Sequence, residues 1–222
     1  MNGRLIVIEG IDGSGKSTQF RRVCERLEAD GIDFRHVVFP RYEEESSALI
    51  RMYLGGEFGN DPDAVNAYAA STFFAVDRFA SYAKDWKEYY QNGGVILCDR
   101  YTTSNALHQG SKLDREEREK FYKWLYDFEF GLLGLPKPDG VFYMSVPLSL
   151  SLANMAARRK ETGETGDIHE NHNDYLEACL NAAGHAAEYF GWSVISCADE
   201  RGEMRPISEI TDELYNKVRS LI

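Results

Sequence analysis

The stretch VIEGIDGSGKST, residues 7–18, decides the fold, because an apolar run gives way there to closely spaced glycines and then to Gly-Lys-Ser-Thr. Its spacing fits the phosphate-binding loop G-x-x-x-x-G-K-[ST], and residues 5–8 supply the buried strand that such a loop needs. After the loop, apolar residues recur three and four apart, which predicts a helix from Ser17 to near Gly31. The local order is therefore strand, loop and helix.

The loop has the chemistry of a phosphate site. Its glycines let backbone N–H groups turn inward around an anion, and the N-terminus of the following helix adds partial positive charge. Lys16 adds a full charge, and the Ser17 hydroxyl suits a Mg²⁺ ion that bridges terminal phosphates. We therefore expect ATP with Mg²⁺; the alternative is a glycine-rich turn that matches by chance. The predicted ATP-binding residues are Gly10, Asp12, Gly13, Ser14, Gly15, Lys16, Ser17 and Thr18.

Composition limits what else the chain can be. Its 222 residues, 43% hydrophobic, favour one domain over residues 1–222. A net charge of −11 argues against binding a nucleic acid polymer or an anionic membrane. The four cysteines are scattered, and no apolar stretch is long enough for a signal or spanning segment. We expect a cytoplasmic protein without membrane contact.

Short apolar runs alternate with stretches long enough for helical crossovers. This alternation predicts an α/β fold with three layers, in which about five parallel strands are flanked by helices. In such sheets ligands bind at the carboxyl ends of the strands. The predicted strands are residues 5–9, 34–39, 95–99, 141–146 and 194–197.

Charged residues follow the predicted second and third strands, as Pro40-Arg41-Tyr42 and Asp99-Arg100-Tyr101. Asp99 stands where a metal-bound water is usually held, and an arginine fork such as Arg100 suits a second phosphoryl group. The alternative is that Asp99 and Arg100 only pair with each other. Asp12, inside the loop, either positions Mg²⁺ or the attacking phosphate or is a turn residue.

The motifs FPRY at 39–42, YLGGEFG at 53–59, TFFAVDR at 72–78, DRYTTSNALHQG at 99–110 and RRKETGETGDIHE at 158–170 follow the loop in this order. In this set the chain resembles the thymidylate kinases. The resemblance implies transfer of the γ-phosphate of ATP to dTMP, giving dTDP and ADP for dTTP synthesis. It also implies an adenylate-kinase-like P-loop fold with a lid segment, and a homodimer.

The resemblance also assigns substrate-binding residues. It places Phe74 on the thymine ring and Arg78, one helical turn later, in a hydrogen bond with the base. It places Asn105 and Gln109 at the sugar and base, and Arg41 and Arg100 at the monophosphate, with Tyr42 nearby. For Phe74 the alternative is a purely structural place in the core.

Two departures from the family pattern matter. His108 stands where many relatives have an aromatic residue that crowds the sugar 2′ position, so the strictness of deoxyribose selection is open. The phosphate loop also lacks the catalytic arginine that some relatives carry. The basic residues at 157–160 resemble those of a mobile lid, expected at about 155–170, and Arg158, with Arg159 second, is expected to supply the charge. The alternative is a solvated helix end.

These inferences define a mechanism by residue. Lys16, Arg100, Arg158 and Asp12 are the predicted catalytic residues, and Ser17, Asp99 and Asp12 are predicted to hold Mg²⁺. Three other functions stay open: a deoxynucleoside kinase, a kinase for another nucleoside monophosphate such as dUMP or dCMP, and a non-catalytic ATP-binding switch.

Overall fold

The computed structural model describes residues 3–162 and 173–222, and its centre is a five-stranded parallel sheet with the order β2-β3-β1-β4-β5. Each predicted strand is present, with ends that differ from the prediction by at most one residue. The strands are β1 (Arg4–Glu9), β2 (Phe34–Val38), β3 (Val95–Asp99), β4 (Gly140–Ser145) and β5 (Ser193–Ser196).

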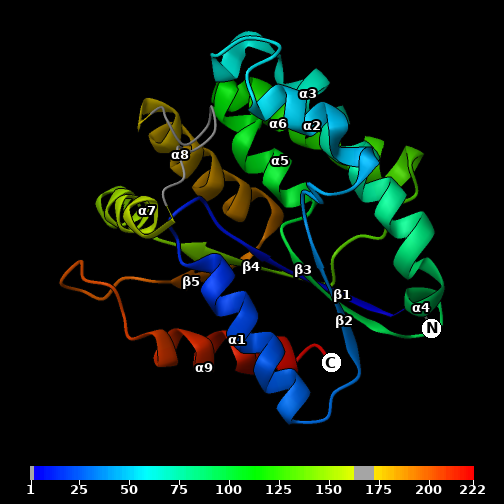
Figure 1. The fold of residues 1–222 in the computed structure, drawn as a ribbon, viewed down its shortest axis with the longest axis vertical. Helices are drawn as coiled ribbons and strands as arrows, with labels where there is room; N and C mark the ends of the chain where they lie inside the picture. Colours follow the sequence, from blue (N-terminus) through cyan, green and yellow to red (C-terminus); the bar gives the residue numbers. More distant parts are fainter. Residues whose placement is uncertain (1–2, 163–172) are drawn as a thin grey trace.

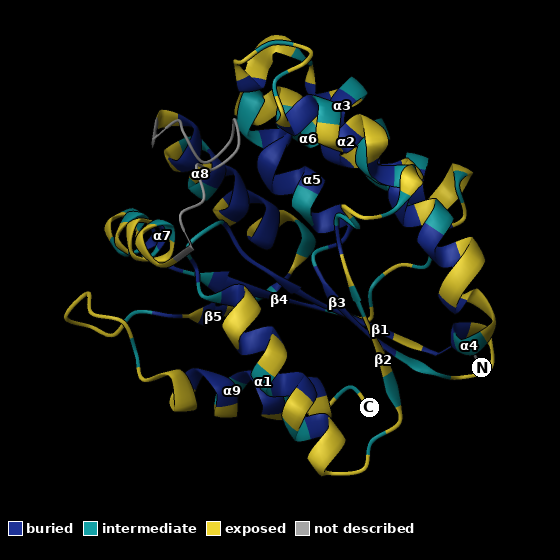
Figure 2. Cartoon of the chain, viewed as in Figure 1, coloured by how far each residue is buried: buried dark blue, intermediate teal, exposed yellow. Residues whose placement is uncertain are grey.

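The middle of this sheet forms the core. In β1, Leu5, Ile6, Val7 and Ile8 are fully buried, and β3 and β4 are buried along most of their length. The edge strands β2 and β5 are partly exposed, and Figure 2 shows this change from the centre to the edges. Near-continuous apolar strands are what a parallel sheet covered on both faces requires.

Helices cover both faces of the sheet (Figure 1). On one face lie α1 (Lys16–Ala29) and α9 (Ile207–Arg219); on the other lie α5 (Thr102–His108) and α8 (Asn173–Phe190). The predicted apolar stripe of α1 faces the core, because Phe20, Val23, Cys24 and Leu27 are buried. The predicted first helix is thus confirmed, beginning one residue earlier than expected.

The remaining helical elements lie in the segments that follow β2, β3 and β4 in the chain. They are η1 (Glu45–Ser47), α2 (Ala48–Leu54), η2 (Pro62–Ala64), α3 (Ala67–Ser81), the π-helix η3 (Tyr82–Trp86), α4 (Lys87–Gln91), η4 (Gly110–Lys112), α6 (Arg115–Tyr126), the π-helix η5 (Asp127–Leu132) and α7 (Leu148–Thr162). The predicted lid begins inside α7, and residues 163–170 of it lie outside the described residues.

The strand order sets where ligands meet. From β1 the chain goes to β2 and β3 on one side of the sheet, and then to β4 and β5 on the other. The direction of winding therefore changes at β1, and crevices at such points are the usual binding sites of open α/β sheets. The loops that follow β1 and β3 leave neighbouring strands at this edge.

Candidate active site

The phosphate loop joins β1 to α1 and needs its glycines for two reasons. Gly13 and Gly15 have φ angles of 74° and 81°, which other residues rarely adopt. A Cβ on Gly13 would also lie 2.3 Å from the backbone oxygen of Ser151. Any side chain at position 13 would therefore force the loop away from α7.

Two side chains of α7 hold this loop from outside. Ser151 Oγ donates to the carbonyl oxygen of Asp12 at 2.7 Å, and Asn154 Nδ2 donates to that of Gly13 at 2.8 Å. Both carbonyl oxygens are thereby engaged by α7, which fixes the loop that offers its N–H groups to an anion. Our sequence analysis missed this pair, for which the only signal was two polar residues three apart on one helix face.

Lys16 and Asp99 form a buried ion pair at the floor of the loop, in which Lys16 Nζ donates to Asp99 Oδ1. Burial lowers the pKa of Lys16, and the nearby Arg100 adds to this effect, whereas Asp99 opposes it. The alternative pairing of Asp99 with Arg100 is therefore wrong, since Asp99 pairs with the loop lysine instead.

Arg100 follows β3 with a φ of 66°, an uncommon angle for a residue with a side chain. Its Nη2 donates to Asp12 Oδ1 at 2.7 Å, and its Nη1 lies 3.4 Å from Glu9 Oε1 and 3.2 Å from His108 Nε2. Burial alone would lower the pKa of Arg100, but Asp12 and Glu9 outweigh it and raise that pKa. The guanidinium is therefore a permanent charge beside the phosphate loop.

Glu9 is a third residue that sequence analysis missed. This fully buried carboxylate also accepts from Gly10 N at 2.9 Å, from Thr103 Oγ1 at 2.6 Å and from Ser104 Oγ at 2.8 Å. It thus connects the start of the phosphate loop to the first turn of α5. The apolar pattern of a buried strand does not reveal that the acid at its end accepts hydrogen bonds from residues 94 and 95 positions further along the chain.

Two cavities meet at Arg100. The donor groove, about 520 Å³, follows the phosphate loop, and the acceptor cavity, about 80 Å³, lies on the other side of Asp12 and Arg100. The enclosed part of the acceptor cavity is smaller than the roughly 300–1,000 Å³ of typical ligand pockets. Its lining includes these predicted substrate-binding residues: Tyr42, Phe74, Arg78, Arg100, Asn105, His108 and Gln109.

Glu129 of η5 organises the far end of the acceptor cavity. Its carboxylate, fully buried, accepts from Arg78 Nε at 2.7 Å and from Arg78 Nη2 at 2.5 Å. It also accepts from Thr102 Oγ1 at 2.6 Å and from Asn105 Nδ2 at 3.3 Å. Because a carboxylate only accepts, it fixes the amide nitrogen of Asn105 on its own side and leaves the amide oxygen as an acceptor.

The other lining residues fit a ligand in different ways. Neither amide atom of the fully buried Gln109 has a hydrogen-bond partner among the residues that the structure describes. A buried amide in this state costs about 1–3 kcal/mol until a partner arrives, which favours a ligand contact. Phe74 lines the cavity and also packs against the cluster formed by Ile50, Tyr53 and Leu54, so it serves both the cavity and the core.

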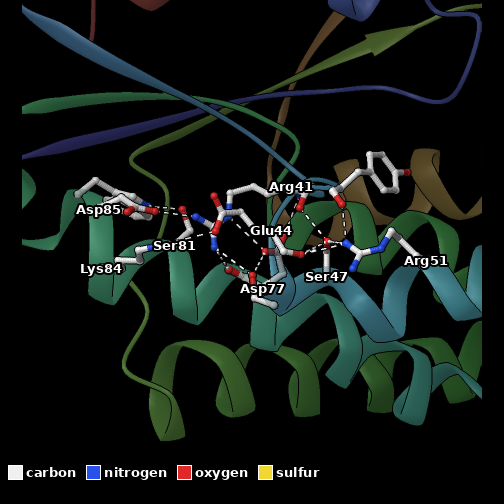
Figure 3. Close-up of polar contacts among 11 residues, drawn as sticks. Arg41, Glu44, Ser47, Arg51, Asp77, Ser81, Lys84 and Asp85 are labelled. Carbon is white, nitrogen blue, oxygen red and sulfur yellow. Dashed lines mark hydrogen bonds and ion pairs between the residues drawn. The ribbon is translucent and has the colours of Figure 1, made fainter.

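Arg41 forms ion pairs with carboxylates outside the lining of the acceptor cavity. Figure 3 shows it between α3 and Asp85, with Nε 3.2 Å from Asp77 Oδ1 and Nη1 2.6 Å from Asp85 Oδ2. Ser46 Oγ also donates to Asp77 at 2.6 Å. Within the described part of the chain, Arg41 is not among the residues that line the acceptor cavity. Its predicted contact with the monophosphate stays a prediction.

The donor groove also contains the charge expected from the lid. Arg158 of α7 is exposed and lines this groove, together with Asn154 and Met155. The helix continues through Thr162, so Arg158 lies within α7 and not at its end. Arg158 lies just before the last turn of α7, which contains Arg159 and Lys160, so both the lid role and the solvated helix end stay predictions.

The oxygen donors at the loop fit a magnesium ion. Ser17, exposed on the first turn of α1, offers a hydroxyl, and Asp99 and Asp12 offer carboxylates. Mg²⁺ prefers such oxygen ligands, one or two from the protein and the others from phosphates and water. Within residues 3–162 and 173–222, no group of three or more His, Cys, Asp and Glu side chains could hold a metal ion.

A phosphate loop on the central strand and a second cavity across a partly buried arginine are the features of a P-loop kinase of small phosphorylated molecules. A family model described as thymidylate kinase matches residues 8–188. The chain belongs to the thymidylate kinase family. The predicted family, fold class and reaction, in which ATP phosphorylates dTMP, are thereby confirmed.

Individual relatives agree with this assignment. The chain is 34% identical over 169 residues to a thymidylate kinase of Mycobacterium tuberculosis strain H37Rv. The matched residues cover 76% of this chain and 77% of that protein. It is 30% identical over 162 residues to a thymidylate kinase of Plasmodium falciparum, covering 73% and 68%. A solved thymidylate kinase from Candida albicans shares the fold, with a TM-score of 0.72 and 20% identity over 99% of this chain and 92% of that chain.

Proposed function

We propose that this chain transfers the γ-phosphate of ATP to dTMP across the wall that Asp12 and Arg100 form. The observation that carries the proposal is that these two side chains line both the donor groove and the acceptor cavity. Two phosphate chains bound in the two sites would meet at one guanidinium. Such convergence is what an in-line transfer between phosphates needs.

On the donor side, the backbone amides of the loop and Lys16 bind the β- and γ-phosphates of ATP. Lys16 then donates to a phosphate oxygen in place of Asp99. Because the site has a low dielectric, the fixed charge of Lys16 stabilises the phosphate strongly. Ser17, with Asp99 and Asp12, would hold Mg²⁺, which neutralises charge on the triphosphate. No nucleophilic side chain is required.

On the acceptor side, Arg100 holds the phosphate of dTMP with its fork. A phosphate oxygen of dTMP forms the new bond to the γ-phosphorus while the bond to the β-phosphate oxygen breaks, and ADP leaves with that oxygen. Arg100 stays charged throughout because its pKa is raised. Its contribution is therefore position and charge stabilisation.

The base would lie at the far end of the acceptor cavity. We assign ring stacking to Phe74 and hydrogen bonds to Arg78, Asn105 and Gln109. A donor from Arg78 beside an acceptor from Asn105 matches the carbonyl and N–H of a thymine edge, whereas cytosine offers the reverse pattern. Glu129 supports this choice because it fixes both side chains.

Closure and assembly complete the proposal. We assign Arg158 to the γ-phosphate as a lid arginine, with Arg159 as the second choice, and closure to the exclusion of water. We further propose one kinase domain over residues 1–222, a homodimer, and a cytoplasmic location, which the four buried free cysteines support. Among the described residues no helix is long and apolar enough to cross a membrane.

A single assay tests the proposal. ADP release is measured with Mg-ATP and, in turn, dTMP, dUMP, dCMP, AMP, thymidine or no acceptor. We expect dTMP to give the highest rate and dUMP to follow by a modest factor, since one methyl group contributes about 1–3 kcal/mol of discrimination. Turnover with thymidine but not dTMP would indicate a deoxynucleoside kinase, and slow turnover that ignores every acceptor would indicate a switch.

A further inference from the structure

His108 is the last residue of α5, and its ring contacts Arg100 from the acceptor side. His108 Nε2 lies 3.2 Å from Arg100 Nη1. A guanidinium only donates hydrogen bonds, so Nε2 must be the acceptor, and the ring proton of a neutral imidazole then sits on Nδ1. The contact thus defines both the tautomer of His108 and the direction of one arm of Arg100.

Helix α8 fixes the ring from behind. The Tyr175 hydroxyl donates to the backbone oxygen of His108 at 3.1 Å and lies 3.5 Å from Nδ1, and Cys179 Sγ lies 3.7 Å from the same nitrogen. The His108 and Tyr175 rings are also stacked, with an interplanar angle of 23°. With the residue only 9% exposed, the imidazole has little freedom to turn away from Arg100.

The electrostatic setting keeps this imidazole neutral. Burial lowers the pKa of His108 to about 4, and Arg100 adds to the effect; among the described residues, Asp12, Lys16 and Lys112 also act on the ring. A neutral acceptor orients an arginine without cancelling its charge and without repelling an incoming anion. Asp12 and Glu9 hold the same guanidinium, but as anions they offset its charge and repel an incoming phosphate.

We propose that His108 is a positioning residue that orients the Arg100 guanidinium toward the phosphate of the acceptor nucleotide. The inference rests on the proposed function, in which Arg100 binds that phosphate. It departs from the role that the family resemblance suggests for this position, namely crowding of the sugar. The two roles differ in what they touch: one acts on phosphate affinity, the other on the sugar.

The test compares dTMP with thymidine, which lacks the phosphate, as ligands of the full chain in calorimetric titrations. His108→Phe keeps a ring of similar size but removes the acceptor, and His108→Gln places an amide near the Nε2 position. We expect His108→Phe to weaken dTMP binding about tenfold, the worth of one charge-assisted hydrogen bond, and thymidine binding less than twofold. His108→Gln should stay within about threefold of the unchanged chain for both ligands.

Several outcomes would overturn the inference. Equal weakening of dTMP and thymidine by His108→Phe would make the ring structural, and an altered preference for dUMP over UMP with an unchanged dTMP-to-thymidine ratio would assign His108 to the sugar. If His108→Phe does not fold, His108→Asn replaces it, because its short amide reaches only the Nδ1 position; behaviour like that of His108→Gln would then contradict the inference.

Arg100→Ala separates this inference from the proposed function. If it leaves the dTMP-to-thymidine affinity ratio unchanged, then Arg100 does not bind the phosphate and the proposed function fails at that residue. If Arg100→Ala lowers the ratio and His108→Phe does not, the proposed function stands and only the positioning role is wrong.

Discussion

The donor groove and the acceptor cavity share the wall of Asp12 and Arg100 but are built differently. The donor groove contains one long continuous segment, residues 11–19, whose backbone is shaped by glycines and held by two side chains of α7; side chains of α7 and of residues 204–210 complete its lining. The acceptor cavity is made of side chains from several separate segments. The comparison teaches that a backbone site depends on local sequence, whereas a side-chain site depends on partners that hold each group from behind.

The largest effect should come from the charge that α7 brings to the donor groove. We expect Arg158→Ala to lower kcat about 10³-fold at saturating ATP and dTMP, as loss of an arginine does in other phosphoryl transferases. Arg159→Ala, with the same loss of charge one residue along the helix, tests the second choice for this role. Steady-state rates decide: if each variant loses less than about fivefold in kcat, neither arginine reaches the transferred phosphoryl group.

Lys16 tests the backbone site itself. Lys16→Ala removes the fixed charge at the β- and γ-phosphates, and we expect kcat to fall at least about 10²-fold, in line with the loss of other preorganised donors. Affinity for dTMP, measured by titration without ATP, should change little. Because the variant leaves Asp99 without its buried partner, thermal melting is measured as the control for folding. Turnover equal to that of the unchanged chain would refute the phosphate-loop assignment.

The difference in construction explains what the sequence could predict. Repeating apolar runs and the loop motif predicted all five strands within one residue and the first helix, because these depend on local patterning. The residues that support the site could not be predicted: Glu9, Glu129, Ser151 and Asn154 act on partners far along the chain, and no local pattern identifies those partners. Arg41 shows the same limit, since its motif does not reveal that Asp77 and Asp85 compete for it.

The free energy of unfolding should also depend on pH, because of His108 in the acceptor cavity. The pKa of His108 is about 4 in the folded chain, against about 6.5 when unfolded, so between these values only the unfolded state takes up the proton. The free energy of unfolding should therefore fall as pH falls from 6.5 toward 4, by about 2 kcal/mol between pH 7 and pH 5. Urea unfolding of the unchanged chain and of His108→Gln at both pH values isolates this term. Identical pH dependence in the two chains would contradict it.

Glu129 tests the support behind the base site. Glu129→Gln replaces one of the two acceptor oxygens that face Arg78 with an NH₂ group, which is a donor. At least one buried hydrogen bond is therefore lost. We expect the KM for dTMP to rise about tenfold while the KM for ATP stays within about twofold. Thr102→Val is the matched control, because it removes another donor to Glu129 without altering a residue that lines the cavity. An equal rise in both KM values would mean that the network supports the whole fold and not the base site.

The smallest effect on catalysis is expected at Arg41, and it sharpens the comparison most, because the family motif predicts a phosphate contact there and the structure shows two ion pairs. In the structure Arg41 is engaged by Asp77, which is 1% exposed, and by Asp85. Moving it to a phosphate would break both ion pairs. We therefore expect Arg41→Ala to change the KM for dTMP by less than about threefold, far below the effect of Arg100→Ala.

The same variant should be visible in stability. Removal of the guanidinium leaves the buried carboxylate of Asp77 with the Arg41 backbone N–H at 2.9 Å and the Ser46 hydroxyl at 2.6 Å. With those two donors retained, we expect the free energy of unfolding to fall by only about 1–2 kcal/mol, less than for a charge left wholly without partners. Arg41→Lys, which keeps the charge but loses the fork, is the control. If Arg41→Ala instead raises the KM for dTMP more than about tenfold without affecting ATP, then the arginine leaves Asp77 and Asp85 when the acceptor binds, and the ion pairs of Figure 3 belong only to the state before binding.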